Sequence, residues 1–323
     1  MRVGAICGMS VLSALALVLS CGSDGDSGGS GPADSAILAF ISNRDGDPEV
    51  YVMNADGSNP RMVSEGAETN YSPAWKPDGT QIVFTSYAKV EIAPDEPCPQ
   101  DELPPYPPEI YSIDPDGSNR VRLSRYALGE SDCPTWSYMP TWSPDGSEIA
   151  FISSRSGAAD IYIMNADGTG EVNVTNTPDV SEEYPAWSPD GTRIAFTSSE
   201  DGNPEIYVMQ RDGTGRIRLT TDSATDERPA WSPDGTQIAF NSDRDGDQEI
   251  YVMAQDGTNQ TRITDDPGRD YYSAWSPDGE RISFTSNRGG DPQIYVMAAD
   301  GSDEKAITSG SPDTWSSAAS WKP

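Results

Sequence analysis

Short apolar stretches alternate with polar turn sequences along most of the chain, and this pattern predicts strands. Residues 185–220 are typical and read PAWSPDGTRIAFTSSEDGNPEIYVMQRDGTGRIRLT. The stretches PAW, RIAFTS, EIYVM and RIRLT are rich in β-branched and aromatic residues, and Asp-Gly turn signals separate them. We therefore expect four short antiparallel strands in this segment.

The same segment recurs around six tryptophans. They are Trp75, Trp142, Trp187, Trp231, Trp275 and Trp321, at spacings of 67, 45, 44, 44 and 46 residues. A repeat in the mid-forties with four strands per unit is typical of a β-propeller blade. Apolar residues on both faces of the second strand, as in Ile194, Ala195 and Phe196, fit blades packed between neighbours.

The repeat region is incomplete at both ends, and the two ends complement each other. SAILAF (35–40) matches a second strand with no first strand before it, and SAASWKP (317–323) matches a first strand with no second strand after it. We expect an all-β fold, a six-bladed β-propeller over residues 36–323. Its first blade would combine three N-terminal strands with one C-terminal strand, leaving no free sheet edge. An open solenoid would instead need polar caps at both ends.

These motifs carry a family resemblance. AWSPDGTRIAFTS, EIYVM and the Asp-Gly turns resemble the TolB-like, WD-type propeller repeats of bacterial envelope proteins over nearly all of residues 36–323. The resemblance implies a six-bladed propeller. TolB carries an additional N-terminal α/β domain, whereas only a short tether precedes the first strand here. We therefore expect a free-standing relative rather than the Tol-Pal component itself.

The N-terminus predicts export and lipid anchoring. Residues 1–20 have one arginine followed by apolar or small residues, which indicates a signal peptide. A membrane anchor is the alternative, because the length is borderline for a span. Val18-Leu19-Ser20-Cys21 resembles a bacterial lipobox, which implies that Cys21 is lipidated. Residues 21–35 then form a Gly/Ser/Asp-rich tether. Gly22 follows the cysteine, which implies the outer membrane, facing the periplasm, in a Gram-negative cell.

Charge and composition exclude several functions. The net charge is −31, which disfavours nucleic acid and anionic lipid as ligands and favours basic partners. Solubility alone is an alternative reason for the acidity. The chain has no histidine, so a Ser-His-Asp triad, a Cys-His pair and the commonest metal ligand are missing.

The second blade is about 22 residues longer than the others because of two insertions on one face. Each insertion contains one cysteine, Cys98 or Cys133. In an oxidising compartment these two are expected to form a disulfide, which would contribute about 3–4 kcal/mol by constraining the unfolded chain. Two free thiols are the alternative.

The candidate ligand site lies where loops enter the innermost strands, on the face with variable loops. Carboxylates and phenols gather at positions three to five residues before the motif tryptophans. We expect these residues to line a channel mouth suited to a cation, a basic peptide or a stacked sugar. The candidates are Asn70, Tyr71, Glu182, Glu183, Tyr184, Asp226, Glu227, Arg228, Asp270, Tyr271 and Tyr272. A solvated rim is the alternative for any one of them.

No cofactor is predicted, and calcium is the alternative at two acidic loops. NRDGDPE (43–49) and DRDGDQE (243–249) resemble part of a calcium loop but lack its other ligands. The calcium candidates are Asp45, Asp47, Asp243, Asp245 and Asp247. Hairpin turns with Asx hydrogen bonds explain these loops better.

Together these features predict a lipid-anchored extracytoplasmic propeller that binds a protein or peptide of the bacterial envelope, acting as a monomer. No catalytic residues are assigned. A carbohydrate-active enzyme, a glycosidase or lyase using the channel-mouth carboxylates, is one alternative. A structural spacer in an envelope assembly is another.

Overall fold

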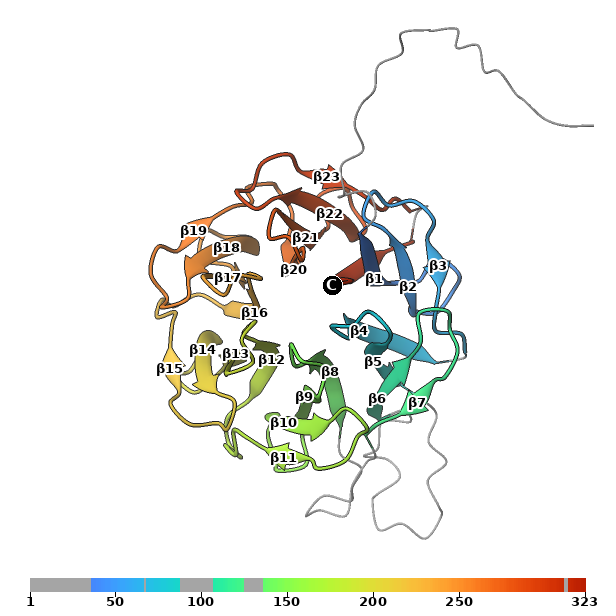
Figure 1. Cartoon of the computed structure of the whole chain (residues 1–323). Helices are drawn as coiled ribbons and strands as arrows, with labels where there is room; N and C mark the ends of the chain where they lie inside the picture. The colour runs from blue at the N-terminus through green and yellow to red at the C-terminus, as the bar shows by residue number, and fades with distance from the viewer. Residues whose placement is uncertain (1–35, 67, 88–106, 125–135, 311–312) are drawn as a thin grey trace, which may run out of the picture. The chain divides into compact units, whose positions relative to one another are not determined.

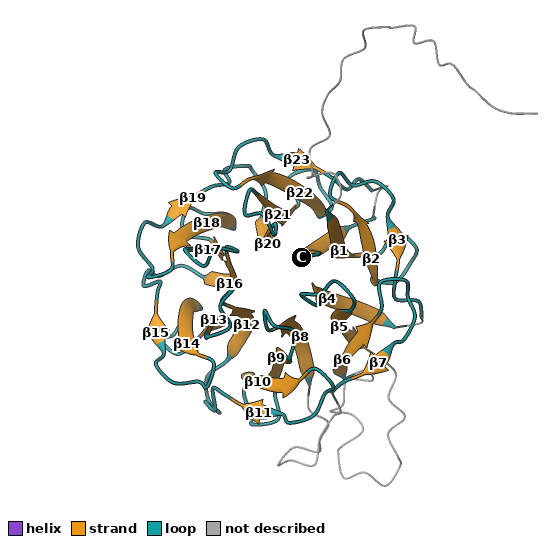
Figure 2. Ribbon diagram, in the orientation of Figure 1, coloured by secondary structure: helices purple, strands orange, loops and turns teal. Residues whose placement is uncertain are grey.

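The computed structural model describes residues 36–66, 68–87, 107–124, 136–310 and 313–323. Six four-stranded antiparallel sheets surround a common axis within Pro32–Pro323 (Figure 1). The described residues form strands and loops without a helix (Figure 2). The predicted six-bladed β-propeller is confirmed. Cys21, Cys98 and Cys133 lie outside the described residues, so their lipidation and disulfide stay predictions.

The strands occupy four positions, numbered outward from the axis. The innermost strands are β24 (Ser316–Trp321), β4 (Thr69–Trp75), β8 (Ser137–Trp142), β12 (Glu182–Trp187), β16 (Asp226–Trp231) and β20 (Asp270–Trp275). The second strands are β1 (Ile37–Ser42), β5 (Ile82–Tyr87), β9 (Glu148–Ser153), β13 (Arg193–Ser198), β17 (Gln237–Ser242) and β21 (Arg281–Ser286). The third strands are β2 (Glu49–Asn54), β6 (Pro108–Ile113), β10 (Asp160–Asn165), β14 (Glu205–Gln210), β18 (Glu249–Ala254) and β22 (Gln293–Ala298). The outermost strands are β3 (Arg61–Met62), β7 (Val121–Arg122), β11 (Val172–Asn173), β15 (Ile217–Arg218), β19 (Thr261–Arg262) and β23 (Lys305–Ala306).

The ring closes as the incomplete ends of the repeat predict. Blade one has the strand order β24-β1-β2-β3, and Trp321 pairs with Leu38 (Figure 1). The indole Nε1 of Trp321 also donates to the carbonyl of Ala274 in blade six at 3.1 Å. Blades two to six contain β4–β7, β8–β11, β12–β15, β16–β19 and β20–β23. Pairing of β1 with β24 covers the edge that each strand would otherwise expose.

Aromatic pairs build the core of each blade. In blade four, Phe196 of β13 is fully buried opposite Tyr207 of β14, with ring centroids 5.8 Å apart. The Arg216 guanidinium lies 5.2 Å from the Phe196 ring. The same arrangement of a phenylalanine beside a tyrosine recurs in all six blades. Buried apolar residues on both faces of the second strands join neighbouring blades, as the sequence pattern predicts.

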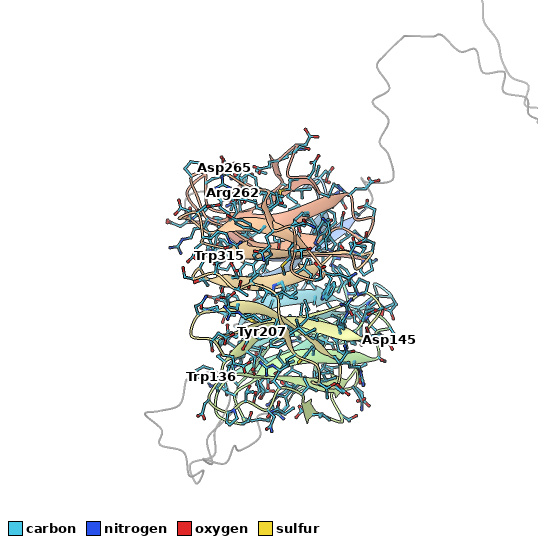
Figure 3. All side chains as sticks on the ribbon, turned by 90° about the vertical axis from the view of Figure 1, so that its left-hand side faces the viewer. Trp136, Asp145, Tyr207, Arg262, Asp265 and Trp315 are labelled. Atoms are coloured by element: carbon cyan, nitrogen blue, oxygen red, sulfur yellow. The ribbon has the colours of Figure 1, made fainter. Side chains whose placement is uncertain are left out.

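The two faces of the ring carry different kinds of turn. On one face the SPDG turns are structural: Asp190 Oδ1 accepts from the Thr192 amide at 3.0 Å, and Gly191 has a φ of 70°. The innermost strands begin at the opposite face. Figure 3 shows Trp136 and Trp315, which precede innermost strands, on one side and Asp145 of an SPDG turn on the other.

Among the described residues, no helix has the length and apolar character needed to cross a membrane.

Candidate ligand pocket at the ring axis

The channel-mouth candidates occupy three successive positions on the innermost strands. The first position lies five residues before the motif tryptophan and is buried within the blades. Its occupants are Asn70, Ser137, Glu182, Asp226, Asp270 and Ser316. Successive side chains of a strand point to opposite faces of the sheet, so the side chains at the first position point away from those at the second position. The four predicted site residues among them, Asn70, Glu182, Asp226 and Asp270, therefore do not line the axial pockets.

Arginines of the same blade pair with two of the carboxylates at this position. Asp226 and Asp270 form ion pairs with Arg244 and Arg288 at 2.8 and 2.7 Å. Burial raises the pKa of both carboxyl groups, and hydrogen bonds and the arginine charges oppose that rise. Each arginine also stacks on the aromatic pair of its own blade. The Arg244 guanidinium lies 4.7 Å from the Tyr251 ring centroid. The role of these ion pairs is to hold the blade together.

The second position lies four residues before the tryptophan and divides the ring into two sides. Its occupants are Ser317, Tyr71, Tyr138, Glu183, Glu227 and Tyr271, in the order of blades one to six. The tyrosines and Ser317 line one pocket, and the two glutamates lie in blades four and five. At this position, the carboxylates therefore lie in blades four and five, and the tyrosines lie in blades two, three and six.

The third position has an unusual backbone in every blade. Its occupants are Ala318, Ser72, Met139, Tyr184, Arg228 and Tyr272, all with φ between 52° and 58°. The register of the innermost strand shifts at or beside this residue in each blade. Such a bulge redirects a side chain. The amides of Met139, Arg228 and Ala318 donate to threonine hydroxyls of the preceding blade at 3.0–3.1 Å.

Three large side chains of the third position stack near the axis. The Arg228 guanidinium lies 4.5 Å from the Tyr184 ring centroid and 4.6 Å from that of Tyr272. It donates to Tyr184 Oη at 2.8 Å and pairs with the carboxylate of Glu227. Glu227 also accepts from Gln248 at 2.6 Å. We call Tyr184, Arg228 and Tyr272 the axial stack.

An aromatic pocket of about 470 Å³ lies beside the axial stack. Its walls include five tyrosines and one tryptophan, and its residues come from blades one, two, three and six. The lining comprises Ile41, Tyr71, Ser72, Thr85, Tyr87, Tyr138, Met139, Tyr271, Tyr272, Pro292, Trp315, Ser317 and Ala318. Ser317 and Ala318 of β24 contribute small side chains to this lining. We call this cavity the tyrosine pocket.

Four tyrosines of this pocket, Tyr71, Tyr87, Tyr138 and Tyr271, have a raised pKa and are neutral phenols at physiological pH. Burial raises the pKa of Tyr71, and the charge of Asp47 adds to the rise. Burial and the charge of Glu183 act in the same way on the pKa of Tyr138. The rings of Tyr71 and Tyr87 meet edge to face, with centroids 5.6 Å apart. The pocket thus presents polarised ring faces and neutral hydroxyl groups to a ligand.

Sequence reasoning placed Tyr71, Tyr271 and Tyr272 in the site but missed several lining residues. Tyr138 shares the strand position of Tyr71, and the repeat alignment places it among the phenols four residues before the motif tryptophans. Tyr87 stands where other blades have an asparagine, serine or aspartate after the second strand. Trp315 directly precedes β24, one residue before the three candidate positions of the innermost strand. Glu183, Tyr184, Glu227 and Arg228 lie on the opposite side of the axis.

A second hollow of about 370 Å³ follows the axis toward the SPDG face. The third-position residues and the proline, alanine and tryptophan residues that follow them form its walls, including Arg228, Pro229 and Trp231. The axial stack contributes to this wall, and Tyr272 also belongs to the tyrosine pocket.

Three of the calcium candidates accept hydrogen bonds from residues outside their loops. Asp45 accepts from Tyr51 Oη at 2.5 Å, and Asp243 accepts from the Thr225 amide at 2.8 Å. Asp245 accepts from Tyr251 Oη. In the described part of the chain, no group of three or more Asp, Glu, Cys or His side chains could hold a metal ion. Calcium binding at these loops stays a hypothesis from the sequence.

Comparison with known proteins agrees with the architecture. The TolB beta propeller domain matches residues 105–259 and 225–323. The chain is 34% identical over 141 residues to the Tol-Pal system protein TolB of Anaeromyxobacter dehalogenans strain 2CP-C, covering 44% of this chain and 27% of that protein. It is 31% identical over 166 residues to the protein TolB homolog of Chlorobium luteolum, covering 42% and 35%. The chain thus spans roughly a third or less of these relatives.

Solved structures share the fold. The crystal structure of TolB from Acinetobacter baumannii matches with a TM-score of 0.72 and 22% identity, covering 90% of this chain and 67% of that one. The structure of putative TolB from Agrobacterium tumefaciens matches with a TM-score of 0.67 and 22% identity, covering 90% and 99%.

Fold and site together define a closed six-bladed β-propeller with an aromatic pocket at its axis. Within that class, the family match covers more than half of the sequence. The chain belongs to the TolB β-propeller domain family.

Proposed function

We propose that this propeller is a binding module of the bacterial envelope and that it holds a protein or peptide segment in the tyrosine pocket. The observation that carries the proposal is the pocket itself: a concave aromatic surface on the face where loops vary, built on a rigid ring. Aromatic side chains supply much of the binding energy at protein interfaces. Relatives named as Tol-Pal system proteins support an interaction role in the envelope.

Export and anchoring belong to the same proposal. The apolar residues 1–20, the lipobox-like sequence ending at Cys21 and the tether of residues 21–35 support a lipoprotein. In a Gram-negative cell it would sit on the outer membrane and face the periplasm, as a relative of the Tol-Pal component. Cys21→Ser should move the protein from the membrane fraction to the soluble fraction. Equal membrane association of both forms would contradict the anchor.

Filling the pocket tests the binding role. Ser317→Tyr places in blade one the residue that blades two, three and six already have at this position, so the backbone accommodates it. The new ring would occupy the pocket. The full chain and this variant would be cross-linked in envelope preparations, and the captured proteins identified by mass spectrometry. We expect the variant to lose one specific partner at least tenfold.

A matched control separates pocket filling from added aromatic surface. Ile217→Tyr adds the same ring at the outer edge of blade four, where Ile217 is 61% exposed. It should capture the partner as the unchanged chain does. If Ser317→Tyr folds normally by circular dichroism and captures every partner equally well, the tyrosine pocket is not the binding site.

The carbohydrate-active alternative has less support. Of the five carboxylates among the channel-mouth candidates, Glu182 and Asp226 are fully buried in ion pairs with Arg216 and Arg244. Neither can approach a glycosidic bond in this arrangement.

A further inference from the structure

The axial stack shows which chemical group the tyrosine-lined axis accepts. Arg228 comes from blade five, and its guanidinium lies 4.5 and 4.6 Å from the ring centroids of Tyr184 and Tyr272. One phenol oxygen accepts a hydrogen bond from it at 2.8 Å. The chain thus holds a guanidinium of its own between two tyrosines at the axis. The Glu227 carboxylate pairs with Arg228, so the axial stack and Glu227 together carry no net charge.

The tyrosine pocket offers similar surfaces, and among the described residues that line it none supplies a guanidinium. The positions equivalent to Arg228 in blades one, two and three hold Ala318, Ser72 and Met139, none of which is cationic. Around them stand Tyr71, Tyr87, Tyr138, Tyr271 and Tyr272, the last of which also belongs to the axial stack. The pocket volume of about 470 Å³ is large enough for an arginine side chain with part of its backbone.

The electrostatics of the pocket favour a cation. Among the described residues that line the pocket, none carries a charge. The charges of Asp47 and Glu183 act on the phenols of Tyr71 and Tyr138, and the charges of Arg228 and Arg269 act on the phenol of Tyr271. The chain as a whole has a net charge of −31, which raises the local concentration of basic segments. An anionic side chain would meet the negative ring faces and the net negative charge of the chain.

We propose that the tyrosine pocket is a receptor site for an arginine side chain on a basic segment of the partner protein. This inference rests on the proposed binding function and specifies its chemistry. A guanidinium suits the pocket better than an ammonium, because its planar group stacks on rings while its N–H groups reach the phenol oxygens. The axial stack displays both kinds of contact within the same ring.

Two matched peptides test the inference on the full chain. The probes are acetyl-Gly-Gly-Arg-Gly-Gly-amide and the same peptide with citrulline, which keeps the shape of arginine and removes its charge. Binding would be measured at millimolar peptide by isothermal titration and by fluorescence, since Trp315 lines the pocket. We expect the arginine peptide to bind about tenfold more tightly than the citrulline peptide. A lysine peptide should fall between them.

Two variants locate the binding. Ser317→Tyr should abolish arginine-peptide binding, and Ile217→Tyr should leave it unchanged. Tyr271→Leu keeps the pocket apolar but removes one ring face, so it should reduce the preference for arginine over citrulline by about threefold. Variants would be compared only after their thermal unfolding is shown to be cooperative.

Several results would overturn the inference. Equal binding of the citrulline peptide, tighter binding of a leucine peptide or of an oligosaccharide, or no binding of the arginine peptide would each exclude an arginine site. These results leave the envelope-binding role standing if Ser317→Tyr still loses its cross-linked partner. If Ser317→Tyr still captures the partner and still binds the arginine peptide, both the binding role of the pocket and the arginine site are rejected.

Discussion

Blades one to three and blades four to six present the same backbone to the axis with different side chains. At the third position of the innermost strands, Ala318, Ser72 and Met139 leave space, whereas Tyr184, Arg228 and Tyr272 fill it. The backbone angle φ at these six residues differs by only a few degrees. The repeat therefore fixes the scaffold, and single residues at equivalent positions determine where the axis is open and where it is blocked.

Loss of β24 should reduce the stability of the ring more than any other change considered below. A chain ending before Ser316 would lack the innermost strand of blade one, and it would expose the edge of β1 and the apolar surface that Trp321 covers. We expect a stability loss above about 5 kcal/mol, since a buried tryptophan alone contributes several kcal/mol. Urea unfolding measures it. An unchanged midpoint would show that the ring does not depend on its closing strand.

Arg228→Ser would test whether the filled half of the ring depends on its cation. The change copies Ser72 of blade two and leaves Glu227 without its ionic partner. We expect a loss of about 3 kcal/mol, because breaking a largely buried pair strands one charge. The double change Glu227→Tyr with Arg228→Ser copies the Tyr71-Ser72 pair and should recover part of this loss. If both variants unfold at the same urea concentration, the stranded charge is not the cause.

Glu249→Gln compares blade five with blade six, where Gln293 has the same place. Burial raises the pKa of Glu249 to about 7, with the charge of Asp270 adding to it. The folded-state pKa therefore exceeds the ordinary value of 4.5. The resulting stability is present below about pH 4.5 and is lost as pH rises through 7.

The substitution should remove this pH dependence. Gln293 Oε1 accepts from Thr308 at 2.8 Å, so a glutamine at 249 can keep the bond from Thr264. At pH 8 the variant should be more stable by about 2 kcal/mol, and the two proteins should converge near pH 4. Thermal unfolding between pH 4 and 8 measures the difference. Parallel curves for the two proteins would refute the assignment.

Ala318→Gly should have the smallest effect and the opposite sign. Ala318 has a φ of 53°, which costs an L-residue about 1 kcal/mol and costs glycine little. We expect a gain of about 0.5 kcal/mol after the extra entropy of the unfolded glycine is subtracted. Ala319→Gly, one residue later, is the control and should destabilise by about 1 kcal/mol. Equal effects of both changes would contradict the strain at 318.

The sequence predicts the fold well because each blade repeats the same local signals. Strand stretches, Asp-Gly turns and the spacing of the tryptophans all indicate the same architecture, and the incomplete ends indicate how the ring closes. The site is harder to predict. Asn70, Glu182, Asp226 and Asp270 are close in sequence to pocket residues but point into the blades.

The cause of this difference is geometric. Successive side chains of a strand point to opposite faces of the sheet. The irregular backbone at Ser72 and at the equivalent residues of the other blades interrupts this alternation. Tyr87 and Trp315 reach the pocket from other strands and loops. Their convergence depends on how blades are arranged around the axis, which no repeat pattern records.

The pairing of β1 with β24 also sets the order of events during biosynthesis. Because β1 and β24 come from opposite ends of the propeller, a chain that emerges from its N-terminus leaves β1 without its inner neighbour until the residues of β24 arrive. Throughout that interval the tyrosine pocket lacks Ser317, Ala318 and Trp315. The proposed partner recognition thus becomes available only after β24 has joined the ring.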